Sequence, residues 1–432
     1  MNAIVASYQE QFAHRASLYS EEPKWLGQQR EAAMARLRQS GFPGPRDEDW
    51  RYMPLKPLTG KAYDTDVTED VDVTSLEPWL VPGLESHRLV FVDGLFSAAL
   101  SSGALKEKGV SVQPLSGVLQ SSPDSLPETV REAMAPRDGF QSLNRAFARD
   151  GYVIDITANH ESEVVVECIY LSATEGKAGQ VRNVLCLNQH AKACVIERHC
   201  SVGDIDVLVN AGSHIVLESG SNLDYYLVET MGRRVNMIND FEAVLDSDSN
   251  LKIMTVTLGG GVVRNNINVR LNGPGSHCDM LGVYAASGRQ HIDNHTGVNH
   301  VAPHCSSREL YKGVLDQRSR GVFHGRIRVD QGATKTDATQ ANNNLLLSAD
   351  AEVDTKPQLE IYTDDVKCAH GATVGAMDEN SLFYLRSRGI DVDSARSLLT
   401  FAFVNEVLAE IPMDPLRDFL ESDLARRLIS DQ

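Results

Sequence analysis

The sequence lacks any run of about 18 consecutive apolar residues, which is the length that a membrane-spanning helix requires. Its first twenty residues, MNAIVASYQEQFAHRASLYS, also lack the basic start and sustained apolar core of a signal peptide. Lysine and arginine form no basic run, and 41 of them stand against 59 acidic residues, for a net charge of −18. An acidic surface repels phosphate groups. We therefore expect a cytoplasmic protein that binds neither nucleic acid nor a membrane.

Cysteine is scarce and irregularly spaced. The seven cysteines form no C-x-x-C pair, and their number is odd: Cys168, Cys186, Cys194, Cys200, Cys278, Cys305 and Cys368. A disulfide framework requires paired cysteines in an oxidising compartment. The pattern instead predicts reduced thiols in a cytoplasmic protein.

Common catalytic and nucleotide-binding motifs are missing as well. Neither G-x-S-x-G nor H-E-x-x-H occurs. Residues 332–336, GATKT, lack the second glycine of a phosphate-binding loop. A β-helix enzyme acting on polysaccharides is an alternative, but aromatic residues for stacking on sugars make up only 6% of the chain. The sequence thus predicts a non-enzymatic protein that binds no nucleotide itself.

Three regions follow one another along the chain. Residues 1–150 form a helical and loop-rich N-terminal region, with helix predicted over 1–40. From about 151 to 378, short runs rich in Val, Ile, Leu and Tyr alternate with turn residues, which indicates strands. Residues 379–432 form a helical C-terminal domain. Residues 391–410 are predicted to form a helix that Asp393 or Ser394 caps, and a second helix covers 414–429.

A weak repeat runs through the strand-rich region. Five segments begin with a small residue and continue into a strand-like stretch: AKACVIERH from Ala191, SNLDYYLVE from Ser221, SNLKIMTVT from Ser249, SHCDMLGVY from Ser276 and SRELYKGVL from Ser307. Recurrence every 27–31 residues is typical of stacked coils, as in a β-helix or solenoid. A β-sandwich with evenly spaced strands remains the alternative.

Two groups of side chains offer metal-binding chemistry. In a strand, Cys368 and His370 are two residues apart and share a face. A thiolate and an imidazole could together hold iron, an iron–sulfur cluster or zinc transiently, but two ligands leave the site incomplete. The alternative is a buried cysteine beside a hydrogen-bonded histidine.

The second group contains four histidines and an adjacent cysteine: His291, His295, His300, His304 and Cys305. A stand-alone metal-binding protein would use them as ligands. The alternative is that these histidines make hydrogen bonds within β-coils.

These residues lie in segments that resemble the SufD members of the SufB/SufD family of iron–sulfur cluster assembly proteins. The resemblance is carried by DDVKCAHGATVG (364–375), LFYLRSRGID (382–391) and FPGPRDEDWRYMPL (42–55). It implies a mainly β fold, a right-handed parallel β-helix core with N- and C-terminal helical regions. It also implies a non-catalytic scaffold in the SufBCD complex.

The resemblance further implies the partners and the site. SufB would pair with this chain through the β-helices, and the SufC ATPase would bind the C-terminal helices, where Arg386 and Arg388 are the expected contacts. Cys368 and His370 would lie at the SufB interface and hold iron or a cluster transiently, with SufB completing the ligands. No cofactor would be tightly bound, and ATP would bind only to SufC. Without its partner, the isolated chain could form a homodimer through the same surface.

Overall fold

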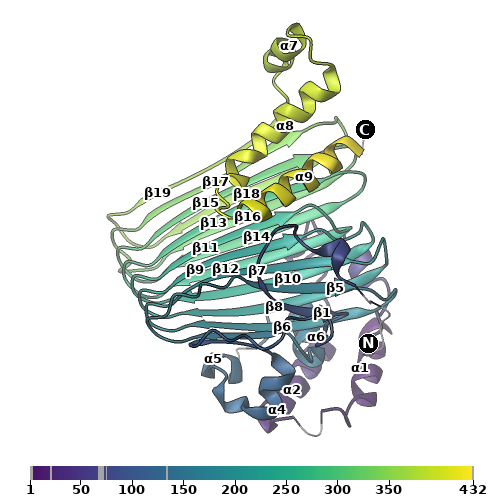
Figure 1. The fold of residues 1–432 in the computed structure, drawn as a ribbon, viewed down its shortest axis with the longest axis vertical. Coiled ribbons are helices and arrows are strands. Elements are labelled where there is room, and N and C mark those ends of the chain that lie inside the picture. The colour runs from purple at the N-terminus through teal and green to yellow at the C-terminus, as the bar shows by residue number, and fades with distance from the viewer. Residues whose placement is uncertain (1–2, 20–21, 67–72, 74, 133–134, 431–432) are drawn as a thin grey trace.

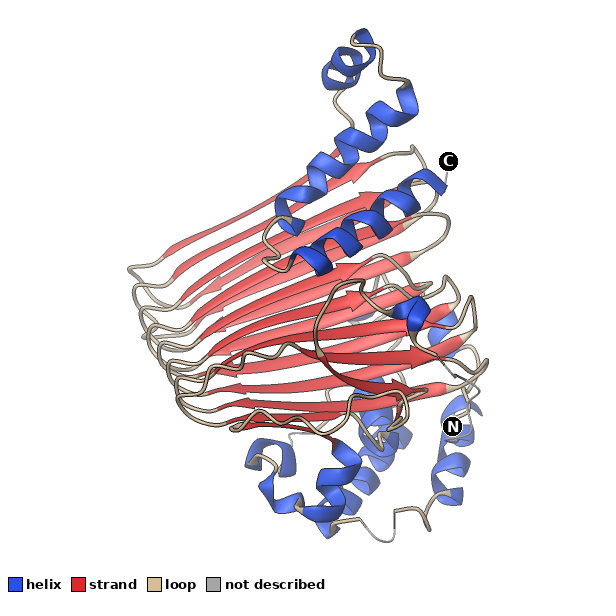
Figure 2. Ribbon diagram, in the orientation of Figure 1, coloured by secondary structure: helices blue, strands red, loops and turns tan. Residues whose placement is uncertain are grey.

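The structure is a computed structural model that describes residues 3–19, 22–66, 73, 75–132 and 135–430. Its centre is a stack of β-coils, with helices at the N-terminal end and a helical arm at the C-terminal end (Figure 1). Helices, strands and loops are distinguished in Figure 2. The predicted helix over 1–40 is present as two helices, with residues 1–2 and 20–21 lying outside the described ranges.

Two sheets face each other, and from β4 onward successive strands alternate between them. The ten-stranded sheet consists of β19 (Lys367–Ala376), β17 (Asp337–Leu346), β15 (Ser306–Leu315), β13 (His277–Ala286), β11 (Asn250–Thr257), β9 (Asn222–Glu229), β7 (Lys192–Ser201), β5 (Val166–Ser172), β1 (His87–Val92) and β2 (Leu95–Phe96). The nine-stranded sheet consists of β18 (Glu352–Ile361), β16 (Arg320–Val329), β14 (His291–His300), β12 (Val262–Leu271), β10 (Val235–Leu245), β8 (Val207–Leu217), β6 (Ala178–Leu187), β4 (Tyr152–Ile156) and β3 (Val110–Pro114). From β4 onward all described pairings are parallel, apart from the antiparallel β3 at the N-terminal end. The parallel β-helix is therefore confirmed, and the β-sandwich alternative is wrong.

The sequence repeat corresponds to one strand of each coil. Ala191, Ser221, Ser249 and Ser276 are all buried and stand immediately before β7, β9, β11 and β13. The alignment of Ser307 was wrong by two residues, because His277 pairs with Ser306 and the equivalent of Ser276 is therefore Cys305. A small side chain recurs at this position because coils stack closely where the chain turns.

The N-terminal helices cover the outer face of the nine-stranded sheet near its first coils. They are α1 (Ala3–His14), α2 (Lys24–Ser40), α3 (Leu55–Thr59), α4 (Leu115–Ser121), α5 (Glu128–Arg131) and α6 (Gly139–Phe147), with the short 3₁₀ turns η1 (Glu48–Trp50) and η3 (Pro123–Ser125). The turn η2 (Glu77–Trp79) lies instead against the ten-stranded sheet, where the Trp79 carbonyl oxygen accepts a hydrogen bond from the Arg198 guanidinium on β7. Asp138 caps α6 by accepting hydrogen bonds from the amides of Phe140 and Gln141. The buried Phe140 then packs with Trp50 at a ring distance of 5.0 Å, which fixes η1 against the sheet.

The C-terminal helices are α7 (Glu379–Ser387), α8 (Val392–Leu408) and α9 (Asp414–Ser430). The two predicted helices over 391–410 and 414–429 are confirmed, but the cap is Asp391, which accepts from the amides of Asp393 and Ser394. Leu398, in the first half of α8, is 51% exposed, because only the second half of this helix reaches the ten-stranded sheet.

An ion pair holds the end of α8 to the sheet. The Arg308 guanidinium on β15 donates to both carboxylate oxygens of Glu410, at 2.9 and 2.7 Å, and to Asp279 at 2.9 Å. We expect Arg308→Ala to lower the free energy of unfolding by about 1 kcal/mol, because the pair is bidentate but partly exposed. Urea unfolding measures this change. Limited digestion with trypsin should also cleave the C-terminal helices faster in Arg308→Ala than in the wild type. Arg318→Ala, which removes an exposed arginine 3.6 Å from Asp350, is the control and should change neither.

Candidate assembly interface at the open end of the solenoid

The last coil of the solenoid is open. Within the described strands, β19 pairs with β17 and β18 pairs with β16, and neither has a neighbour on its other side. Nine of the ten residues of β19 are exposed, whereas eight of the ten residues of β13 are buried. An uncovered strand edge offers unpaired backbone N–H and C=O groups to another chain. We call β18 and β19 together the open end.

Cys368 and His370 lie on the open end and share a face, as predicted. In the strand register Cys368 lies over Ala338, and His370 lies over Gln340. Ala338 and Gln340 point into the solenoid and are buried, so the side chains above them occupy the interior side of the last coil. Cys368 is half-buried against Ile327 and neighbouring apolar residues, while His370 is exposed.

The two side chains form an incomplete ligand set. Burial is the main cause that raises the pKa of the Cys368 thiol, and Asp337 adds to it. The isolated chain therefore keeps this thiol protonated, and a metal would have to displace the proton. In the described residues, the group of three potential ligands that lie close enough for one metal ion is found elsewhere, at Asp49, His295 and His324. Any further donors to a metal at Cys368 and His370 would come from a second molecule.

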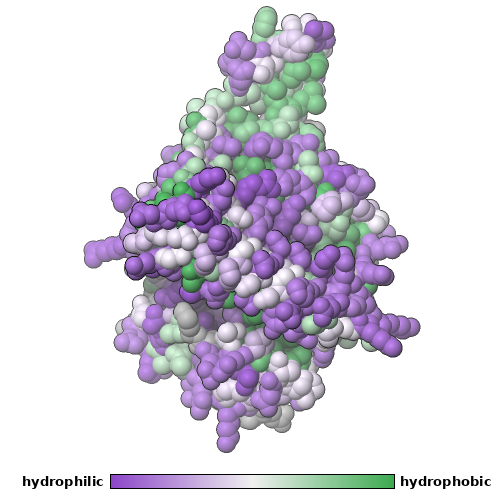
Figure 3. Space-filling view, turned by 90° about the vertical axis from the view of Figure 1, so that its left-hand side faces the viewer, coloured by the Kyte–Doolittle hydropathy of each residue, from purple (hydrophilic) through white to green (hydrophobic). Residues whose placement is uncertain are grey.

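Exposed apolar side chains gather near this end of the protein. Among the described residues, ten large hydrophobic side chains are exposed, and seven of them follow residue 360: Ile361, Tyr362, Val374, Phe383, Tyr384, Val392 and Leu398. Figure 3 shows hydrophobic surface along the protruding arm that contains α7 and α8. Clustered exposed apolar surface marks protein–protein contact sites. We call α7 and the start of α8 the arm. The open end and the arm are thus two adjacent surfaces that are suited to binding other proteins.

Arg386 and Arg388 are both exposed on or next to α7. The Arg388 guanidinium donates to the Tyr384 hydroxyl at 3.1 Å and lies 5.1 Å from the centre of its ring. Arg388 is therefore held along the arm beside an exposed aromatic ring. The structure places both arginines on the arm, and their contact with a partner stays a prediction.

The four histidines considered above do not form one site. His291 and His295 lie on the outer face of β14, whereas His300 points inward, where its Nε2 is 2.9 Å from the Ser307 hydroxyl. His304 lies in a turn with φ of 62°. Cys305 is buried, with Sγ 3.3 Å from the Gly273 carbonyl oxygen. Successive side chains of a strand point to opposite faces, so His291 and His295 lie on the other side of β14 from His300. The hypothesis of a metal site made from these residues alone is therefore wrong.

His324 was not identified from the sequence as a neighbour of His295. It pairs in register with His295 on the neighbouring strand, and the two rings are 4.8 Å apart. The spacing of 29 residues equals the length of one coil here, because β14 and β16 pair residue for residue at that offset. This spacing of one coil length is the sequence signal from which the pairing of His295 with His324 could have been predicted.

None of the helices in the described ranges is long and apolar enough to span a membrane. All seven cysteines lie in the described ranges and are free thiols.

The fold and its open end define a class of protein, a parallel β-solenoid whose last described coil has unpaired strand edges. Comparison with known proteins agrees. Residues 170–403 match the family model for the SUF system FeS cluster assembly SufBD core domain, and residues 2–168 match the SufBD protein N-terminal region. The chain belongs to the SufBD family of SUF-system iron–sulfur cluster assembly proteins.

Individual relatives cover most of the chain. The iron–sulfur cluster assembly protein SufD of Escherichia coli (strain K12) is 31% identical over 417 residues, which cover 95% of each chain. A SufBD family protein of Synechocystis is 27% identical over 425 residues, covering 96% of this chain and 94% of the relative. A SufBD family protein of Mycobacterium leprae is 33% identical over 247 residues, covering 54% and 63%.

Proposed function

We propose that this chain is a SufD-type, non-catalytic scaffold subunit of a cytoplasmic SufBCD complex. The open end pairs with the solenoid of SufB, and the C-terminal arm binds the SufC ATPase, which alone holds ATP. Cys368 and His370 support iron acquisition or cluster formation at the SufB interface. The observation that carries the proposal is that an incomplete thiol–imidazole pair lies on an unpaired strand edge.

Three features support the separate parts of the proposal. The unpaired edges of β18 and β19 can continue both sheets into a second solenoid. Phe383 and Tyr384 are 74% and 57% exposed, which is costly for a surface that stays in water. The relative of matching length from Escherichia coli is named as a SufD assembly protein.

The test is co-expression of this chain with SufB and SufC, followed by measurement of bound iron and acid-labile sulfide. We expect Cys368→Ala and His370→Ala each to leave the complex intact and to lower its cluster content about tenfold, because each removes a ligand. Cys186→Ala, a half-buried cysteine on β6, and His14→Ala, an exposed histidine on α1, are matched controls.

Two results would contradict the proposal in different ways. Unchanged cluster content in both variants means that Cys368 and His370 only pack, and that the chain is an architectural partner of the ATPase. Failure of the wild-type chain to co-purify with SufB removes the interface itself.

A further inference from the structure

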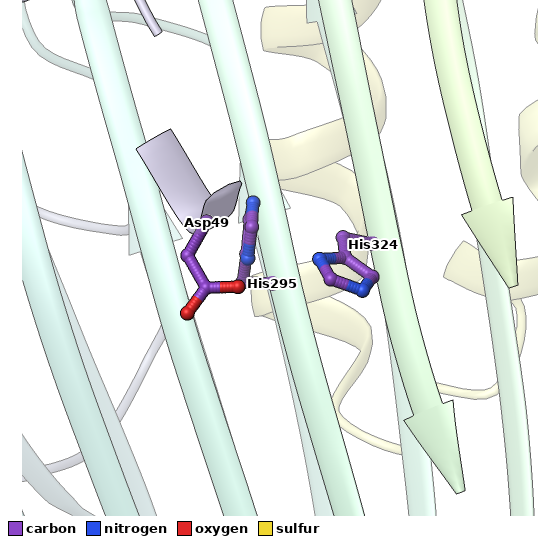
Figure 4. Close-up of side chains that lie close together, drawn as sticks. All are labelled: Asp49, His295 and His324. Carbon is purple, nitrogen blue, oxygen red and sulfur yellow. The ribbon is translucent and has the colours of Figure 1, made fainter. Parts of the chain in front are cut away.

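A second group of metal-ligand residues lies on the outer face of the nine-stranded sheet, on strands that continue directly into β18 of the open end. Figure 4 shows Asp49, His295 and His324, with the His295 ring between the other two side chains. One ligand atom from each residue lies within 4.8 Å of the other two. The three residues come from η1, β14 and β16, so the fold brings them together from distant parts of the sequence.

The strand register positions the two histidines. His295 and His324 are directly paired on neighbouring parallel strands, and both point away from the solenoid interior. Neighbouring strands lie about 4.8 Å apart, a separation at which two imidazoles can reach one ion. β14 and β16 pair with each other, and each also pairs with a second strand, β14 with β12 and β16 with β18. The backbone at both histidines is therefore fixed within the sheet.

The third residue is held by its backbone. The Asp49 carbonyl oxygen accepts a hydrogen bond of 2.6 Å from the Arg264 guanidinium, which also lies 4.0 Å from the centre of the Trp50 ring. Trp50 itself is buried. These contacts fix η1 on the sheet, while the Asp49 side chain is exposed and makes no hydrogen bond within the described residues.

The surroundings of the histidines are those of metal ligands. Nε2 of His295 lies 3.0 Å from Oδ1 of the buried Asp293, and a ligating histidine commonly uses its other nitrogen toward such a carboxylate. Nε2 of His324 is shielded from solvent and has no hydrogen-bond partner in the described part of the chain. A buried nitrogen without a partner is costly, and a metal ion would satisfy it.

The geometry points to a binding site for a divalent first-row transition metal ion, such as Zn²⁺ or Fe²⁺, with Asp49, His295 and His324 as its ligands. Two imidazoles and one carboxylate suit these ions, whereas Mg²⁺ and Ca²⁺ prefer oxygen alone. Tetrahedral metal–ligand bonds of about 2.0–2.2 Å place the ligand atoms roughly 3.4 Å from one another. The three atoms, which lie within 4.8 Å of one another, would therefore close in by up to about 1.4 Å on binding, chiefly through rotation of the exposed Asp49 side chain. A groove of about 430 Å³ opens beside the ligands and leaves further coordination positions to water or another molecule.

Calorimetric titration of the full-length chain with Zn²⁺ tests this proposal. We expect one site, and at least about tenfold weaker binding in each of Asp49→Asn, His295→Ala and His324→Ala, because each variant removes one ligand. His14→Ala replaces an exposed histidine on α1 and should bind like the wild type. Circular dichroism melts confirm that the variants fold, since all three side chains lie on the outside of the solenoid.

Two further measurements separate this site from the open end. Cys368→Ala and His370→Ala should leave Zn²⁺ affinity unchanged. Titration with Co²⁺ should give ligand-field bands without the thiolate charge-transfer band that Cys368 would produce. Zinc binding that is absent in the wild type, unchanged in His324→Ala, or lost in Cys368→Ala would overturn the proposal. None of these results depends on whether the chain pairs with SufB.

Discussion

Val374→Lys combined with Ile361→Lys is expected to weaken the proposed association of this chain with SufB by at least about a hundredfold. The two residues lie on β19 and β18, one on each sheet of the open end, and are 48% and 41% exposed. A second solenoid stacked on the open end would bury both. Each substitution then places an ammonium group in a water-poor interface, at a cost of several kcal/mol when it finds no carboxylate. Lysine on an edge strand also opposes strand addition.

The experiment measures binding of purified SufB to the immobilised chain. Val202→Lys is the matched control, since Val202 is 37% exposed in the turn after β7, several coils from the open end. The double variant should still bind SufC, because the exposed aromatic residues of the arm are unchanged. Full SufB binding by the double variant would show that the solenoids do not meet at the open end. Loss of both partners would indicate a folding defect, which a thermal melt of the isolated chain detects.

The stacked coils could be predicted because a single position repeats. The small residue before β7, β9, β11 and β13 recurs once per coil, and its spacing identifies the architecture without any knowledge of contacts. The same reasoning placed Cys368 and His370 on one face, because the period of two is a local property of a strand. The prediction of stacked coils depends on one repeat length, and the prediction of a shared face depends on a pattern within three residues.

What the sequence did not yield depends on register and on long-range contacts. Placing Ser307 in the repeat failed because its SRE segment resembles the earlier starts, and only the pairing of His277 with Ser306 fixes the alignment. The cap of α8 is Asp391 rather than Asp393 or Ser394. All three residues are acceptable caps, and only the backbone geometry shows which of them accepts hydrogen bonds from the first turn. Asp49 joins His295 through the packing of Trp50 against Phe140, which no local pattern records.

A buried carboxylate two strands below the open end should control the pH dependence of stability. Glu309 on β15 is 2% exposed and accepts a hydrogen bond of 2.5 Å from the Gln340 side-chain amide. Burial is the main cause that raises the pKa of Glu309 to about 7 from the ordinary value of 4.5. The unfolded chain loses this proton near pH 4.5, while the folded chain keeps it to about pH 7. Glu309 therefore lowers the free energy of unfolding progressively as the pH rises from 4.5 to 7, and the loss is complete above pH 7.

Glu309→Gln is expected to remove this loss. Glutamine has nearly the same shape, can accept the bond from Gln340 and cannot ionise. The variant and the wild type should have similar free energies of unfolding near pH 5, and the variant should be more stable by up to about 3 kcal/mol at pH 8. Urea unfolding at a series of pH values measures the difference, and Glu163→Gln, which changes an exposed carboxylate, is the control. A constant difference across this pH range would mean that Glu309 is ionised in the folded solenoid at pH 5, with its charge balanced inside the coil.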